Sequence, residues 1–319
     1  MPRYQFGKAE ARAIYDYLGG IGAEQRTGVE PDRVRFAVAV PPGQTELGHR
    51  IKDAFDAAWR RLGQARPHGR FPDLRVVEVA GADQFGDASP FAFLLSVPDS
   101  SRRFFAEAAR ARIPVLLPFS QAEGTESPED IRTAFTTVDD QITSLLEHVG
   151  NEVMIVVDAQ GQQRLERVGL TARYNAVPID EFVAGDAAAA TIILLGGTSA
   201  AARLEQAGMR LEESTIYQLW IDAARRSNAS LKATGAKIVV AVPYDARNWE
   251  GAKLSIDALA ETAALLVQKG LVAAGRDLTR QRFLNSFGTL RLAPPSWPAL
   301  DYTRHELGGT ADTGYIPAQ

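Results

Sequence analysis

Short apolar runs alternate with longer amphipathic segments along this chain. The run VRFAVAV at 34–40 is rich in β-branched residues and is followed by Pro41-Pro42-Gly43, which predicts a buried strand. In 46–62 the apolar residues recur at helical spacing, which predicts an amphipathic helix. The same alternation predicts strands at 74–79, 91–96 and 113–119, and a helix from Ser100-Ser101 through Ala111. Strands alternating with helices are typical of a parallel, doubly wound sheet.

The pattern then starts again. The second set comprises strands at 153–157, 173–177, 191–195 and 214–220, with helices near 161–168 and from Thr198-Ser199 onward. A repeated α/β unit predicts two similar lobes, and ligands of such sheets bind outside the carboxyl ends of the strands.

The remaining segments are expected to return to these lobes rather than to form a third domain. They comprise a strand at 236–242, helices at 252–268 and 278–287, and a final Pro-, Gly- and Thr-rich stretch with an extended piece around Tyr315. We therefore predict an N-terminal helix in 1–30, a first lobe of 31–137 plus about 243–272, and a second lobe of 138–242 plus about 273–319.

Composition narrows the function classes. The 319 residues carry 35 Lys and Arg against 39 Asp and Glu, with no concentrated basic stretch, so nucleic acid is an unexpected partner. No apolar run approaches the roughly 18 residues that span a bilayer, so the chain is not expected to be membrane-embedded. Cysteine is absent, which excludes disulfides and thiolate nucleophiles. The first residues show no export signal.

Motifs of enzymatic chemistry were sought and not found. The sequence lacks both a GxxxxGK[ST] motif and a GxGxxG motif after a strand. It also lacks a GxSxG elbow, and its four histidines show no metal-binding spacing. Asp139-Asp140 precedes a helical pattern, where carboxylates favour a helix start. We expect no catalytic residue and no metal site.

Two helix starts remain as candidate binding positions. Ser100-Ser101 and Thr198-Ser199 each follow a buried strand, so their hydroxyls and the free N–H groups of the first turn could receive an oxygen-rich ligand. Serine and threonine are also ordinary helix caps, and the sequence leaves both interpretations open.

Several longer segments resemble a known family. IPVLLPFS (113–120), FTTVDD (135–140) and NEVMIVVD (151–158), in this order, are similar to the first lobe and crossing of branched-chain amino acid-type solute-binding proteins. ATIILLGGTSAAARLEQAGMR (190–210) resembles their second-lobe segment, and GRDLTRQRFLNSFGTLR (275–291) their late helix. The resemblance covers about 32–319 and implies a type I periplasmic binding-protein fold with two Rossmann-like lobes. It also implies a periplasmic, monomeric protein that binds a small organic molecule in the cleft between its lobes.

The resemblance also assigns candidate ligand contacts. They are Ser100, Ser101, Phe119, Ser120 and Gln121 in the first lobe and crossing, and Gln160, Thr198, Gln218 and Trp220 in the second lobe. Phe119 and Trp220 would form an apolar wall, although both could equally be core residues.

The chain departs from the family where an amino acid would bind. It has DAQGQQ (158–163) in place of a Tyr-Gly pair, a bulky Phe119 where a small residue is usual, and no acidic residue in Gln218–Trp220. We therefore expect a small carboxylate, aromatic or alcohol-derived ligand at least as readily as an α-amino acid.

The first thirty residues do not belong to this pattern. Met1-Pro2 followed by KAEARAIYDYLGG (8–20) resembles the last helix of a class I cytochrome c, whose methionine ligates haem iron. That resemblance implies a fusion whose haem domain and export signal would lie upstream of Met1, with no cofactor in this chain. The alternative is an amphipathic helix packed on the first lobe.

Two functions therefore remain. The first is a periplasmic binding protein whose closed form is recognised by an ABC transporter permease or a redox partner. The second is a cytosolic ligand-sensing regulatory domain of the same fold.

Overall fold

The computed structural model divides into two compact units. Most of the chain after residue 22 is described, in the ranges 23–79, 89–98, 101–121, 130–150, 153–170, 174, 176–182, 191–196, 198–206, 211–222, 225–243, 255–303 and 313–317. The described residues of the first unit fall within Met1–Phe119, Ser127–Arg132 and Leu254–Glu306. Those of the second unit fall within Ser120–Glu126, Thr133–Lys253 and Leu307–Gln319. Both units are α/β, as the alternating pattern predicts.

The first unit is built on a parallel sheet with strand order β2-β1-β3-β4-β5. Its strands are β1 (Arg33–Val40), β2 (Phe71–Glu78), β3 (Ala92–Leu94), β4 (Val115–Leu116) and β5 (Ile131–Arg132). β1 is apolar along most of its length because neighbouring strands and helices bury it on both faces.

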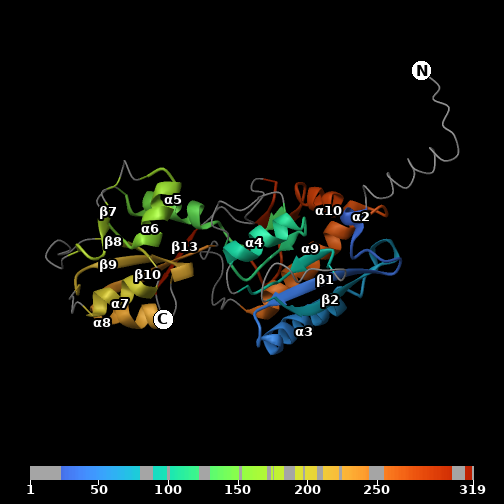
Figure 1. The fold of residues 1–319 in the computed structure, drawn as a ribbon, viewed down its shortest axis with the longest axis horizontal. Helices are drawn as coiled ribbons and strands as arrows, with labels where there is room; N and C mark the ends of the chain where they lie inside the picture. The colour runs from blue at the N-terminus through green and yellow to red at the C-terminus, as the bar shows by residue number, and fades with distance from the viewer. Residues whose placement is uncertain are drawn as a thin grey trace, which may run out of the picture. The chain divides into compact units, whose positions relative to one another are not determined.

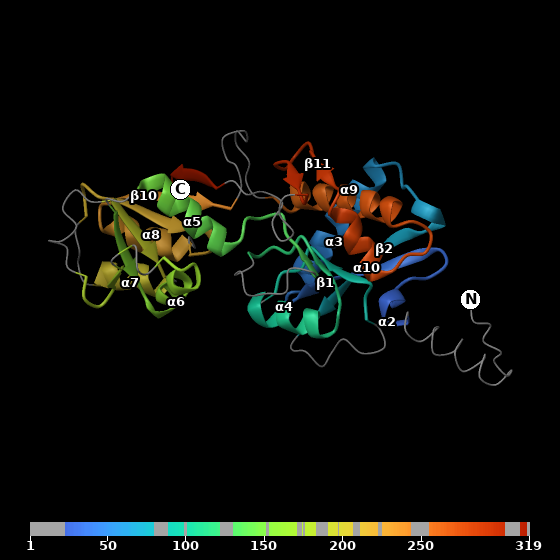
Figure 2. The same cartoon turned by 90° about the horizontal axis from the view of Figure 1, so that it is seen from above.

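Helices cover this sheet. They are α2 (Ala23–Arg26), α3 (Thr45–Arg61), the 3₁₀ turn η1 (Pro67–Gly69), α4 (Ser101–Arg110), α9 (Ile256–Ala274) and α10 (Arg280–Phe287). Figures 1 and 2 show α3 and α4 on opposite faces of the sheet, and α9 packs along α3. A small antiparallel ribbon, β11 (Arg291–Leu292) with β12 (Leu300–Asp301), completes the unit.

The second unit has a mixed sheet with strand order β13-β10-β9-β8-β6-β7. Its strands are β6 (Val153–Val157), β7 (Ala176–Pro178), β8 (Thr191–Leu195), β9 (Thr215–Leu219), β10 (Lys237–Val242) and β13 (Gly314–Pro317). The first five in chain order run parallel, whereas β13 pairs antiparallel with β10 at the sheet edge.

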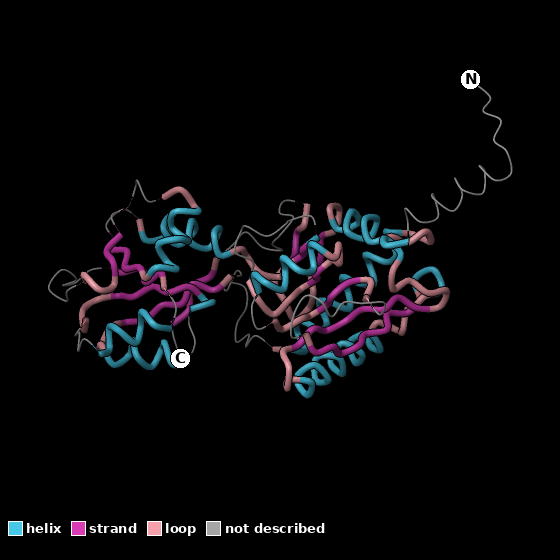
Figure 3. The backbone as a smooth tube through the Cα atoms, in the orientation of Figure 1, coloured by secondary structure: helices cyan, strands magenta, loops and turns pink. Residues whose placement is uncertain are grey.

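Helices also lie on both faces of the second sheet (Figures 1 and 3). They are α5 (Val138–Val149), α6 (Ala159–Arg167), α7 (Thr198–Gln206), η5 (Trp220–Asp222) and α8 (Arg225–Ala233). Ile142 of α5 and Leu165 of α6 pack on one face, while Leu204 of α7 and Leu231 of α8 pack on the other. The predicted doubly wound α/β class is confirmed.

The structure differs from the sequence-based division of the chain at its C-terminal part. The division placed about 273–319 in the second lobe, but α10 packs against α9 in the first unit. Phe283 and Phe287 of α10 lie so close to Gly270 that a Cβ atom there would come within 2.8 Å of both rings. Hydrophobic periodicity does not reveal that a glycine lies opposite two phenylalanines, so it could not assign α10 to the first unit. The strands β5, β11 and β12 have two residues each, which is too short for a sequence pattern to predict. The predictions for 1–22 lie outside the described residues.

Candidate ligand-binding site

Several sequence-predicted residues lie at the carboxyl edge of the second sheet. In a parallel sheet the carboxyl ends of all strands meet at one edge, and the following loops line it. β6, β9 and β10 end there at Val157, Leu219 and Val242. Gln160 follows β6 and Trp220 follows β9, so topology brings these two candidates to the same edge.

Trp220 forms part of an aromatic pair. Its ring stacks on the ring of Phe135, with a centroid separation of 5.3 Å and an interplanar angle of 30°. Trp220 keeps part of its surface exposed, whereas Phe135 is buried. A partly exposed tryptophan stacked on a buried partner is suited to contact a flat or apolar ligand.

Gln121 belongs to a buried chain of amides behind this pair. Its Nε2 donates to the carbonyl of Thr136 at 2.8 Å and to Oε1 of Gln141 at 3.2 Å. Nε2 of Gln141 in turn donates to the carbonyl of Ala241, at the end of β10. The amides thus connect the segment before α5 to the carboxyl edge of the sheet.

Two polar atoms in this region have no hydrogen-bond partner among the described residues. They are Oγ of Ser120 and Oε1 of Gln121, and both atoms are buried. A buried acceptor without a partner costs about 1–3 kcal/mol, so such groups usually meet a water molecule or a ligand. Both atoms belong to residues that the family resemblance selects.

A buried ion pair involves the same 3₁₀ turn as Trp220. Nη1 of Arg164 donates to Oδ2 of Asp222 at 2.9 Å, and both side chains are almost fully buried. Asp222 ends the 3₁₀ turn that Trp220 begins, so the pair ties this turn to α6. Asp222, the carboxylate nearest to Trp220 in the sequence, is therefore bonded to the guanidinium of Arg164.

Gln160 lies in the first turn of α6, at an open pocket of about 610 Å³. Asp158 caps this helix, because its Oδ1 accepts from the N–H of Gly161 at 2.8 Å. Across the pocket, Arg203 of α7 forms an ion pair with Asp180. The pocket lies within the second unit and offers neutral amides together with a paired guanidinium.

The remaining candidates are placed differently. Gln218 is buried and, by strand alternation, shares its face with Ile216, which packs in the cluster of α7 and α8. Phe119 is half-buried in the first unit, and its N–H donates to the carbonyl of Ser96 at 2.8 Å. Ser101 begins α4 and Thr198 begins α7, as the pattern predicts. Ser100 lies outside the described residues.

Sequence reasoning missed three residues of this site: Gln141, Arg164 and Asp222. Gln141 carries a detectable signal, because it occupies the buried face of α5 beside Ile142 and Leu145, where an apolar residue is expected. Arg164 is likewise a charged residue on the buried face of α6. A polar residue on an apolar helix face indicates a specific partner.

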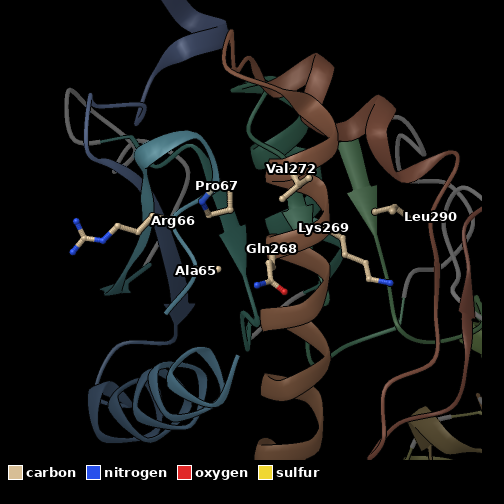
Figure 4. Close-up of a pocket in the computed structure, with 7 residues that line it drawn as sticks. All are labelled: Ala65, Arg66, Pro67, Gln268, Lys269, Val272 and Leu290. Carbon is tan, nitrogen blue, oxygen red and sulfur yellow. The ribbon is translucent and has the colours of Figure 1, made fainter. Parts of the chain in front are cut away.

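A separate hollow in the first unit is lined by none of the predicted contact residues. Its volume is about 480 Å³, and Figure 4 shows its lining residues, which are Ala65, Arg66, Pro67, Gln268, Lys269, Val272 and Leu290. Pro67 belongs to η1, just before the start of β2, so this hollow lies toward the amino end of that strand. Arg66 points away from α9 (Figure 4). The hollow therefore does not match the expected position of a ligand site.

The described part of the chain contains neither a metal-binding cluster nor a membrane-spanning helix. No cluster of three or more His, Asp or Glu side chains that could hold a metal ion occurs there. The helices described here include none that is long and apolar enough to cross a membrane.

Comparison with known proteins defines the class of fold. No protein-family model matches the chain, and no curated protein sequence does. Solved structures do match it, and the shared architecture is that of type I periplasmic binding proteins.

Three of these structures differ in the ligands that their descriptions name. A fatty acid ABC transporter substrate-binding protein from Thermomonospora curvata matches with a TM-score of 0.62 and 16% identity, over 91% of this chain and 89% of that chain. An ABC transporter solute-binding protein from R. palustris, solved in complex with benzoate, matches with a TM-score of 0.61 and 11% identity, over 90% and 93%. A possible leucine/isoleucine/valine-binding protein from Rhodopirellula baltica SH 1 matches with a TM-score of 0.60 and 10% identity, over 91% and 95%.

Proposed function

We propose that this protein is a solute-binding protein that captures a small organic molecule at the carboxyl ends of its sheet strands. The observation that carries the proposal is the Phe135–Trp220 pair, which adjoins the segment bonded to Gln121. A partly exposed tryptophan near buried polar atoms provides the combination of apolar surface and few polar groups that small-molecule sites use. The shared fold with ABC transporter substrate-binding proteins supports the same function.

The charges near Trp220 bear on the kind of ligand. An α-amino acid needs a carboxylate for its ammonium group, and the carboxylate nearest to Trp220 in the sequence, Asp222, is already bonded to Arg164. Recruiting Asp222 would leave a buried guanidinium without its partner, which is costly. We therefore propose an aromatic or aliphatic organic acid or alcohol rather than an α-amino acid.

The fold suggests a physiological setting. We propose that the protein acts in the periplasm as a monomer and that its ligand-bound form is recognised by an ABC transporter permease. A redox-linked role remains tied to the N-terminal cytochrome c resemblance. Detection of the protein in a periplasmic extract would test the location.

Calorimetric titration of benzoate, octanoate and leucine tests the function. We expect the protein to bind benzoate or octanoate, and the Trp220→Ala variant to bind at least about tenfold more weakly because it lacks the stacking surface. Ile221→Ala is the matched control, since Ile221 is the exposed neighbour of Trp220 and contributes no ring.

Tight binding of leucine without any response to the two acids would contradict the proposed ligand class. If native mass spectrometry of protein from its own host detected no bound small molecule, and no probe bound in the titrations, the solute-binding function itself would be wrong.

A further inference from the structure

We propose that Gln141 is a positioning residue that orients the Trp220 wall through Gln121, Thr136 and Phe135. The proposal rests on the proposed function, because it assigns Trp220 to the ligand site. Gln141 lies near the N-terminal end of α5 and is fully buried, so it is not expected to touch a ligand itself.

The first step is the orientation of the Gln141 amide. A backbone carbonyl only accepts hydrogen bonds, so the group that faces the carbonyl of Ala241 must be the NH₂ group of Gln141. Oε1 of Gln141 is thereby directed to Nε2 of Gln121. The end of β10 thus determines which atom Gln141 offers to its neighbour.

The same logic applies to Gln121. Its NH₂ group faces two acceptors, the carbonyl of Thr136 and Oε1 of Gln141. If the Gln121 amide were turned over, its oxygen would meet two other oxygens and both hydrogen bonds would be lost. These hydrogen bonds therefore fix the orientation of both amides. The bond from Gln121 to the Thr136 carbonyl also restrains the backbone at Thr136.

The backbone around Phe135 is restrained from both sides. The N–H of Thr136 donates to the carbonyl of Pro243 at 3.0 Å, and Oγ1 of Thr133 donates to the carbonyl of Phe135 at 2.5 Å. Together with the Gln121 contact, these bonds restrain the segment that carries the Phe135 ring. Trp220 stacks on that ring, so the orientation of the Trp220 ring depends on the hydrogen bonds of Gln121 and Gln141.

The other end of Trp220 is held separately. The Arg164–Asp222 pair restrains the 3₁₀ turn, whereas the ring of Trp220 stacks on Phe135. Leucine at position 141 would fill similar space without burying an amide, at less desolvation cost. What Gln141 provides and leucine cannot is therefore a pair of oriented hydrogen bonds, to Gln121 and to the carbonyl of Ala241.

The test measures the environment of Trp220 directly. The four tryptophans are replaced biosynthetically with 5-fluorotryptophan, and the ¹⁹F resonance of Trp220 is assigned with the Trp220→Phe variant. We expect Gln141→Leu to shift or broaden the Trp220 resonance in the protein without added ligand and to weaken benzoate binding about fivefold to tenfold. The other three resonances should stay in place.

Thr143→Val is the matched control on the same helix, because its exposed hydroxyl donates to the carbonyl of Asp139 and takes no part in the amide chain. Gln121→Leu should shift the Trp220 resonance as Gln141→Leu does, and the double variant should add little, since both act through one chain. Gln121→Leu also serves if Gln141→Leu does not fold.

An unmoved Trp220 resonance in both folded single variants would overturn the positioning role. A moved resonance with unchanged benzoate affinity would overturn the link between Gln141 and the ligand site. A moved resonance in a protein that binds no probe would support the positioning contact and count against the proposed function instead.

Discussion

Tyr302 is a buried phenol in the first unit. It is 2% exposed, and its ring lies 6.1 Å from that of Phe287. Burial raises the pKa of Tyr302 well above its usual value, and the nearby charge of Arg132 opposes this only in part. The neutral phenol is therefore the form that the native state accommodates.

This shift predicts a loss of stability at alkaline pH. Above about pH 10 the unfolded chain releases the Tyr302 proton while the native protein keeps it, so the free energy of unfolding falls as pH rises, by about 1.4 kcal/mol per pH unit for this group. Urea unfolding between pH 8 and 11 measures the slope. In Tyr302→Phe the slope should be smaller by that amount, and an unchanged slope would contradict the assignment.

At the scale of elements, α6 approaches β8 unusually closely. A Cβ atom on Gly161 would lie 1.6 Å from the carbonyl oxygen of Leu195, and one on Gly196 would lie 2.8 Å from the Asp158 carboxyl carbon. The N-terminal turn of α6, which carries Gln160, therefore reaches the sheet edge only because both positions lack a side chain.

We expect Gly161→Ala to destabilise the protein by about 2–3 kcal/mol, because α6 must move away from β8 to remove the clash. Chemical denaturation followed by circular dichroism measures the change. Gly288→Ala is the control. Gly288 has φ −57° at the end of α10, and an added Cβ would meet only the carbonyl oxygen of Asn285, at 3.5 Å. A neutral Gly161→Ala would show that the helix tolerates a larger separation.

At the scale of the whole molecule, each unit has a core of its own. In the first unit Arg280 is 4% exposed and donates to the carbonyls of Pro90, Phe91 and Arg112, at 2.6, 2.9 and 3.0 Å. It thereby ties α10 to the chain around β3. The second unit packs its own apolar clusters on the two faces of the other sheet.

We expect Arg280→Met to destabilise the first unit by about 3 kcal/mol, because two buried carbonyls and one partly buried carbonyl lose a charged donor. Hydrogen exchange should show lost protection in β1 and β3, with β6 and β8 unchanged. Arg282→Met is the control, since its ion pair with Asp277 is exposed. An equal loss of protection in both units would show that they unfold as one.

Only part of the candidate site could be predicted from the sequence. The alternation of apolar runs predicted Gln160 after a strand and Trp220 at the end of one, and a parallel sheet gathers such positions at one edge. The contacts among Gln121, Gln141 and Ala241 join residues up to 100 positions apart, and no local pattern encodes such a distance. Gln141 stood out only as a polar residue on an apolar helix face.

The sequence by itself determined the doubly wound class, the duplication and the succession of the main strands along the chain, since hydrophobic periodicity reflects which face each element buries. Tertiary structure alone decided that α10 packs in the first unit, through Phe283 and Phe287 against Gly270. It alone also placed Phe135 under Trp220 and paired Arg164 with Asp222. The physical reason is that burial is encoded locally, whereas the partner of each buried group is set by the packing of distant segments.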